Sequence, residues 1–307
     1  MSRDVRIETA MTHAALGPLF SSIRQVRSAH ALLEFVVLGS GSSGNASLLR
    51  VTTPELRRQV LIDAGLSPRM VRGQLSVLGF DLAETHEILF THFDNDHAQA
   101  GWARVAMETG MRLRCARRHV RDALGRGYPD MNIDAFDARG EGFSLGPIDV
   151  QPCENPHDEG GTVAFRFETP AGTLGFATDI GRVSDRLVDT MRGVDILAIE
   201  SNYDPQLQEA SSRPRILKDR IMGGKGHLSN RECIEAVRAI AWPDQPAHVV
   251  LLHLSRECNA PEIVRGAWQA ELPTLAARLT LSEARTPTAP LRLRGGQLES
   301  RVEDVNV

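Results

Sequence analysis

The segment Thr91–His97 concentrates residues that can bind metal ions. It reads Thr-His-Phe-Asp-Asn-Asp-His, so two imidazoles and two carboxylates fall between positions 92 and 97, directly after the apolar run Glu87–Phe90. Imidazole nitrogen and carboxylate oxygen are donors that zinc, manganese and iron(II) accept. The density of these donors predicts a metal site on a loop between a strand and a helix.

The order of the donors predicts how they divide between two ions. Alternate positions on an extended segment point to the same side, so we expect His92 and Asp94 to share one ion. We expect Asp96 and His97, at the start of a helix, to face a second ion. The alternative is a polar loop whose acids cap that helix, but one Asp would be enough for a cap.

The pattern around this loop indicates one layered α/β (α+β) domain over residues 34–284. Short apolar runs separated by turn residues begin at Phe35 and recur in both halves of the chain, which predicts strands. Helical patterns lie between them, and this alternation is typical of a sheet covered by helices. The main helical patterns occupy about 68–78, 98–108, 213–222, 230–240 and 260–283.

The two ends of the chain differ from this domain. Residues 1–33 are expected to form an N-terminal extension that is poorly ordered or helical. Residues 285–307 are rich in Pro, Thr and Gly and then charged, which predicts a mobile or loosely docked C-terminal tail. The most apolar runs are too short to cross a membrane, and the four cysteines lack a CxxC spacing, so we expect a cytoplasmic protein with reduced thiols.

The segment His92–His97 resembles the H-x-H-x-D-H signature of the metallo-β-lactamase superfamily, with Asp94 in place of the second histidine. Within that superfamily the chain is most similar to the YycJ/WalJ-type, nuclease-like hydrolases. The matching segments, in chain order, are Gly39–Asn45, Thr178–Leu187, Glu200–Asn202, Gly226–Asn230 and His253–Asn259.

The resemblance implies a four-layer αββα sandwich with two divalent metal ions at one edge of its sheets. It implies that Asp63 supports the metal loop and that Asp179 bridges the ions. The implied ligands are His92, Asp94 and His157 for the first ion and Asp96, His97 and His253 for the second. Because Asp94 is a harder ligand than histidine, the preference is expected to move from zinc toward manganese or iron.

The positions of other residues predict roles beyond metal binding. Asp96 is expected to act as the base, and His227, just before a capped helix, as a phosphate contact or proton donor; the alternative for His227 is a histidine that only fixes its loop. Ser43, Asn45 and Asn202 are expected to contact substrate. The Gly39–Asn45 loop has the alternative of a simple tight turn.

These features favour a metal-dependent hydrolase, namely a phosphodiesterase or exonuclease-like enzyme acting on a phosphodiester such as DNA or RNA. A small-molecule hydrolase of a cyclic phosphodiester, thioester or lactone, and a non-catalytic metal-binding protein, remain alternatives. The formal net charge of −4 excludes a global basic field for nucleic acid. A local basic run, Arg213–Lys225, leads toward His227 and predicts a track for the phosphate backbone. Oligomeric state is not predicted.

Overall fold

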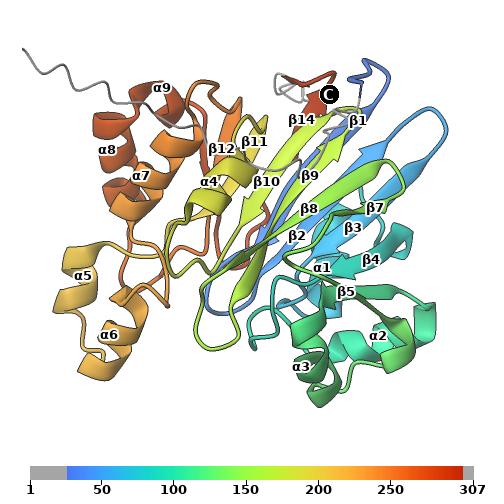
Figure 1. Ribbon diagram of the computed structural model, residues 1–307, viewed down its shortest axis with the longest axis horizontal. Coiled ribbons are helices and arrows are strands. Elements are labelled where there is room, and N and C mark those ends of the chain that lie inside the picture. Colours follow the sequence, from blue (N-terminus) through green and yellow to red (C-terminus); the bar gives the residue numbers. More distant parts are fainter. Residues whose placement is uncertain (1–25, 300–307) are drawn as a thin grey trace, which may run out of the picture.

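Two β-sheets, stacked face to face and covered by helices on both outer faces, make up residues 26–299, the part of the chain that the computed structural model describes (Figure 1). This is the four-layer αββα arrangement expected from the sequence, and that prediction is confirmed. None of the helices between residues 26 and 299 is both long enough and apolar enough to span a membrane.

The first sheet has eight strands, of which the central ones are an antiparallel meander followed by parallel strands. In spatial order they are β15 (Gln297–Leu298), β14 (Leu291–Arg294), β1 (Leu32–Gly39), β2 (Ala46–Thr52), β3 (Arg57–Ile62), β4 (Thr85–Leu89), β5 (Arg112–Ala116) and β6 (Ile133–Phe136).

The second sheet has seven strands, with parallel strands at one side and antiparallel strands at the other. In spatial order they are β13 (Leu279–Leu281), β12 (His248–Leu252), β11 (Ile196–Glu200), β10 (Gly172–Ala177), β9 (Thr162–Thr169), β8 (Ile148–Asn155) and β7 (Phe143–Leu145).

The helices form the outer layers. Those packed on the first sheet are α1 (Pro68–Val77), α2 (Gly101–Thr109) and α3 (Val120–Gly125), with three 3-10 turns, η1 (Leu82–Glu84), η2 (Arg117–His119) and η3 (Asp130–Asn132). Those packed on the second sheet are α4 (Asp185–Met191), α7 (Asn230–Ile240), α8 (Pro261–Glu271) and α9 (Pro273–Ala276). Two short helices, α5 (Pro205–Ala210) and α6 (Arg215–Met222), lie together at one end, away from the sheets (Figure 1).

Strand β1 shows why the sandwich needs almost continuous apolar strands. Its alternate residues Leu33 and Phe35 face the core between the two sheets, whereas Val36 and Leu38 face the core beneath the helices of the first sheet. Side chains on a strand alternate between its two faces, and here both faces are covered. All four side chains are therefore buried.

The C-terminal tail is where the expectation was wrong. Strand β14 pairs with β1, and Leu293 lies opposite Leu33 with its side chain fully buried. Residues 291–298 therefore extend the first sheet and are not loosely docked. Residues 1–25 and 300–307, where the extension and the end of the tail were expected, lie outside the described residues.

The last expected helix is also shorter than the sequence pattern suggested. Helix α8 ends at Glu271, a separate turn α9 follows, and Leu279–Leu281 forms β13 instead of continuing the helix. Pro273 explains the break, because a proline disfavours the helical conformation of the residue before it. Leu272 accordingly has φ −139° and ψ 59°.

Candidate metal centre

The polar side chains of the site come from the carboxyl ends of strands. Asp63 follows β3, His92 follows β4, Asp179 follows β10 and His253 follows β12, while Glu200 is the last residue of β11. Strands β3 and β4 are parallel, as are β10, β11 and β12, so their carboxyl ends lie at the same edge of each sheet. That edge is a common binding position in sheets with parallel strands.

The structure brings the sequence-predicted ligands together in two neighbouring groups. The groups are His92 with Asp94 and His157, and Asp96 with His97 and His253; in each group the ligand atoms lie within 4.8 Å of one another. Asp179 lies between the groups. Its Oδ2 is 3.0 Å from His97 Nε2, and its Oδ1 is 3.1 Å from His253 Nδ1. Its Oδ1 also lies 3.9 Å from His157 Nε2 of the first group, so this carboxylate faces ligand atoms of both groups.

Hydrogen bonds on the outer ring nitrogens turn three histidines toward the centre. His97 Nδ1 is 2.8 Å from Asp63 Oδ2, His157 Nδ1 is 2.8 Å from Gly226 O, and His92 Nδ1 is 3.0 Å from the preceding threonine hydroxyl. His92 Nε2 is buried and has no hydrogen-bond partner among the described residues. Metal-bound histidines are oriented in this way, with the other ring nitrogen hydrogen-bonded to carboxylate or carbonyl.

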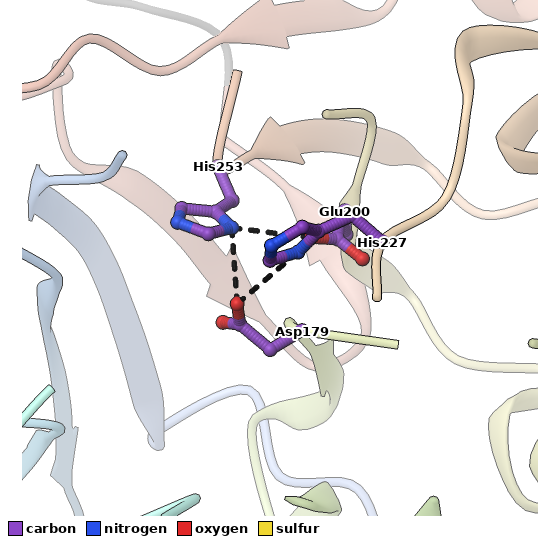
Figure 2. A group of neighbouring side chains, drawn as sticks. All are labelled: Asp179, Glu200, His227 and His253. Carbon is purple, nitrogen blue, oxygen red and sulfur yellow. Dashed lines mark hydrogen bonds and ion pairs between the residues drawn. The ribbon is translucent and has the colours of Figure 1, made fainter. Parts of the chain in front are cut away.

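A third cluster contains Asp179, Glu200, His227 and His253 (Figure 2). Glu200 Oε1 is 2.7 Å from His227 Nδ1 and 3.1 Å from His253 Nδ1, and Glu200 Oε2 accepts hydrogen bonds from two backbone amides. Burial favours a higher pKa for Glu200, but His227 and the hydrogen bonds hold that pKa below its ordinary value. Glu200 is thus a fixed, ionised group behind two histidines.

The electrostatic environment favours a cation. Burial favours a higher pKa for Asp179, but His253 and His97 hold it well below its usual range. Burial opposes a charge on His97 and His253, yet Asp179 and other carboxylates raise the pKa of both well above the ordinary value. Bound divalent cations would replace these protons, which is how metal ligands behave. The donors present therefore fit divalent metal ions.

The backbone is strained at three of these positions. Asp63, Asp179 and His253 have φ values of 61°, 53° and 55°, in the left-handed region that side chains other than glycine rarely adopt. Such conformations cost about 1–3 kcal/mol each and cluster at functional sites. Nearby, a Cβ added to Gly65 would lie 1.7 Å from the carbonyl oxygen of Asp96, so only glycine allows this contact.

Two of the residues expected to contact substrate, Asn45 and Asn202, form hydrogen bonds with residues of the ligand groups. Asn45 Nδ2 is 2.9 Å from His97 Nε2 and 3.3 Å from Asp96 Oδ2, and Asn202 Nδ2 donates to the carbonyl of His253 at 2.7 Å. Both amides are buried, with exposures of 5% and 6%. Ser43 is half-buried, and its Oγ has no hydrogen-bond partner among residues 26–299.

The loop acids do not cap the following helix. Helix α2 begins at Gly101, later than expected, and no side chain caps its first turn. Asp94 contacts the site instead, where its Oδ2 is 3.7 Å from His92 Nε2 with 53% of its side chain exposed. The capping interpretation of this loop is therefore wrong for both Asp94 and Asp96.

A hollow of about 1030 Å³ opens in front of the first ligand group. We call it the metal-centre cleft, and its residues come from the metal loop, from α3, from the loop after β8 and from the end of α6. They are His92–Asn95, His119, Arg121, Asp122, Gly125, Arg126, His157–Gly161, Asp219, Arg220, Gly223 and Lys225.

The basic run beside this cleft does not form the expected free track. Arg213 pairs with Glu257, Arg215 with Glu209 and Asp219, and Arg220 with Asp158, while Lys218 donates to a backbone carbonyl. Lys225 is the member of the run without a side-chain partner among the described residues. Most of the run is thus neutralised within the protein.

Glu200 is the residue that sequence reasoning missed. It was recognised only as part of a matching segment and received no role. The available indication was its position, because an acidic residue directly after the buried strand 196–199 resembles the placement of Asp63 and Asp179. Its partners lie 27 and 53 positions away, so only the tertiary structure shows the contacts.

Comparison with known proteins agrees with this geometry. The model of the beta-lactamase superfamily domain matches residues 58–254. The chain is 29% identical over 234 residues to the exodeoxyribonuclease WalJ of Streptococcus pneumoniae serotype 2 (strain D39), an alignment covering 75% of this chain and 84% of that protein. It is 28% identical over 235 residues to the exodeoxyribonuclease YycJ of Bacillus anthracis, covering 76% and 86% of the two chains.

Solved structures share the fold. One is the zinc-bound PqqB of Methylobacterium extorquens, with a TM-score of 0.63 and 16% sequence identity, covering 83% of this chain and 99% of that one. At this identity the likeness extends to the architecture alone.

Proposed function

This chain belongs to the beta-lactamase superfamily, and on that premise we propose that it is a metal-dependent phosphodiesterase that degrades nucleic acid as an exonuclease. The observation that carries the proposal is the meeting of the two ligand groups, Asp179 and the Glu200–His227 pair at one edge of the sandwich. The exodeoxyribonuclease names of relatives that align over three quarters of the chain support DNA as the substrate.

The metal ions supply activation of water and neutralisation of the phosphate charge when they are bound. We propose His92, Asp94 and His157 as ligands of one ion and Asp96, His97 and His253 as ligands of the other, with Asp179 between them. Asp94 is a harder ligand than the family's histidine, which favours manganese or iron over zinc.

Asp96 is placed to accept the proton of the attacking water. Burial favours a higher pKa for this carboxyl, but His97 and His253 hold the pKa below its ordinary value, so the group is ionised at neutral pH. Its Oδ2 lies 3.4 Å from His253 Nε2 and receives a hydrogen bond from Asn45 at 3.3 Å. These contacts fix the acceptor oxygen, as general-base work requires.

His227 is placed to give a proton to the leaving oxygen. Its Nδ1 is engaged by Glu200 at 2.7 Å, which orients the ring in the way that a buried carboxylate orients a catalytic histidine. The Nε2 atom is left to face the leaving oxygen. With 20% of its side chain exposed, the ring is also open to solvent and substrate.

A substrate panel tests the proposal. Purified protein loaded with manganese, iron or zinc is incubated with 5′-labelled DNA, bis(p-nitrophenyl) phosphate and a thioester, and metal content is measured alongside. We expect cleavage of both phosphodiesters and about two equivalents of metal. Cleavage of the thioester alone would replace this proposal with the small-molecule hydrolase, and binding of less than about half an equivalent of metal would favour a non-catalytic protein.

The cell compartment is a smaller part of the proposal. The four cysteines are free and buried, which suits a cytoplasmic protein because thiols stay reduced there.

A further inference from the structure

We propose that a second pocket, beside the metal centre, binds another phosphate group of the same nucleic-acid strand; this rests on the proposed function. We call it the arginine pocket. It has a volume of about 480 Å³, and its charged lining residues are Arg256, Arg265, Arg285 and Glu283.

The three arginines are available for a ligand. All three are exposed, and none of their guanidinium groups forms a hydrogen bond or an ion pair within the described part of the chain. Arginines elsewhere are commonly paired, as Arg220 is with Asp158 at the metal-centre cleft. Three arginines and one glutamate give the pocket lining an excess of positive charge. A guanidinium group binds phosphate through paired hydrogen bonds.

Two further features of the pocket suit an anion. It includes Pro261, the first residue of the 11-residue helix α8, whose N-terminus has no side-chain cap. Unsatisfied amides and the helix dipole favour negative charge at this position. The pocket is also lined by Ser282, which is 4% exposed and whose buried hydroxyl has no hydrogen-bond partner among residues 26–299.

The arginine pocket and the metal centre share a wall. Leu254, which lines the pocket, directly follows the ligand His253. Ser40 connects the two sites, because its Oγ accepts a hydrogen bond from the His253 amide at 2.8 Å and its own amide donates to the Glu283 carbonyl at 2.9 Å. The two sites are therefore neighbours along the backbone of residues 253 and 254.

Two neighbouring phosphate sites would favour a nucleic-acid strand over a substrate with a single phosphodiester. A nucleic-acid strand carries a phosphate on every nucleotide, so one phosphate can occupy the pocket while another phosphodiester lies at the metal centre. A substrate with one phosphate cannot occupy both sites. The pocket therefore predicts that affinity rises when the substrate gains a second phosphate.

The test compares two triple variants of the metal-loaded protein. Arg256→Ala/Arg265→Ala/Arg285→Ala empties the pocket of positive charge. The control Arg104→Ala/Arg192→Ala/Arg238→Ala removes the same charge from exposed positions on α2, after α4 and on α7, where each arginine has a surface ion pair of small energetic value. Melting temperatures confirm that both variants fold.

Steady-state cleavage of thymidine 5′-(p-nitrophenyl phosphate), with one phosphodiester, and of a single-stranded 12-nucleotide DNA gives the readout. For the wild type and the control we expect a KM roughly tenfold lower for the longer substrate. We expect the pocket variant to lose this gain, and the salt dependence of its log KM to weaken by about 0.7 per lost phosphate contact. Retention of the gain by the pocket variant, or an equal loss in the control, would overturn the proposal.

Failure of the proposed function is a separate result. If the wild type cleaves neither substrate, that function is wrong, and fluorescence anisotropy of the labelled 12-nucleotide DNA then tests the pocket as a strand-binding site. Equal affinity of the two triple variants for this DNA would overturn the proposal that the arginine pocket binds phosphate. An affinity roughly tenfold weaker in the pocket variant supports it.

Discussion

The metal centre and the arginine pocket lie on either side of the hydrogen bonds that Ser40 forms with His253 and Glu283, but they are built in opposite ways. At the metal centre the charged groups are buried and engaged with one another: His97 contacts Asp63 and Asp179, and Glu200 contacts His227. In the arginine pocket the charged groups are exposed, and the guanidinium groups have no partner in the described range 26–299.

The difference indicates what each region can contribute. Buried, mutually fixed groups cost little reorganisation during a reaction, which is the property of a catalytic centre. Exposed arginines keep their rotamer freedom until a ligand arrives, so they contribute to binding more than to the chemical step. Substitutions in the two regions should therefore separate kcat from KM.

The largest expected effect is at Asp96. Asp96→Asn removes the proton acceptor while keeping the shape, and we expect kcat for bis(p-nitrophenyl) phosphate to fall by roughly 10²–10⁴-fold. The control is Asp122→Asn, a carboxylate outside the ligand groups that lines the metal-centre cleft and contacts His119 at 3.2 Å. Normal turnover by Asp96→Asn would show that another residue is the base. The metal centre would then no longer differ from the arginine pocket in its effect on kcat.

His227 should show a substrate-dependent effect. His227→Gln removes the proton donor, so we expect kcat for DNA to fall by about 10²-fold or more. The loss should be smaller for a p-nitrophenyl ester, since p-nitrophenolate leaves without needing a proton. Equal losses with both substrates would indicate that His227 positions its loop and does not donate the proton.

Removing the metal should destabilise the metal centre but not the arginine pocket. Chelation leaves Asp179, Glu200 and their neighbours without cations. Compared with protein in metal at about 100 times its Kd, we expect the chelated protein to melt about 5–10 °C lower. The arginine-pocket variant should show the same drop when chelated. Differential scanning calorimetry with and without chelator, in matched buffers, measures this difference. An unchanged melting temperature would show that the metal does not stabilise the fold.

Metal affinity should depend on pH with a defined sign. Burial opposes a raised pKa at His97 and His253, but Asp179 raises the pKa of both well above the ordinary value, so these rings carry protons that a cation must displace. Affinity for manganese is expected to increase as pH rises through neutrality and to decrease below it. Titration calorimetry at several pH values measures this, and a flat profile would contradict it.

The smallest expected effect is at Asp94. This is the most exposed ligand candidate of the metal loop, so Asp94→His should fold normally and keep kcat within about tenfold. The metal preference should move toward zinc, because imidazole replaces a harder carboxylate. Activity profiles under zinc and manganese are the measurement. An unchanged preference would mean that Asp94 is not a ligand.

Local sequence predicted the helices that have their own start signals. Ser67 caps α1 by accepting a hydrogen bond from the Met70 amide at 3.3 Å, and Ser229 with Glu232 forms the capping box of α7. Both helices lie where the sequence placed them. The strand β14 was missed although its alternation Leu-Arg-Leu-Arg was visible, because its partner β1 lies about 258 positions away along the chain.

The sequence by itself determined which donors are present and that they follow strands, because strand periodicity and ligand chemistry are local properties. It thereby predicted the metal ligands and, through ordered motifs, indicated the family. The tertiary structure alone decided how donors from separate strands meet. It brought Asn45 and Asn202 into contact with Asp96 and His253, placed Glu200 beside His227, and left three arginines unpaired in one pocket. Those relations depend on which strand ends share an edge, and no short stretch of sequence encodes that.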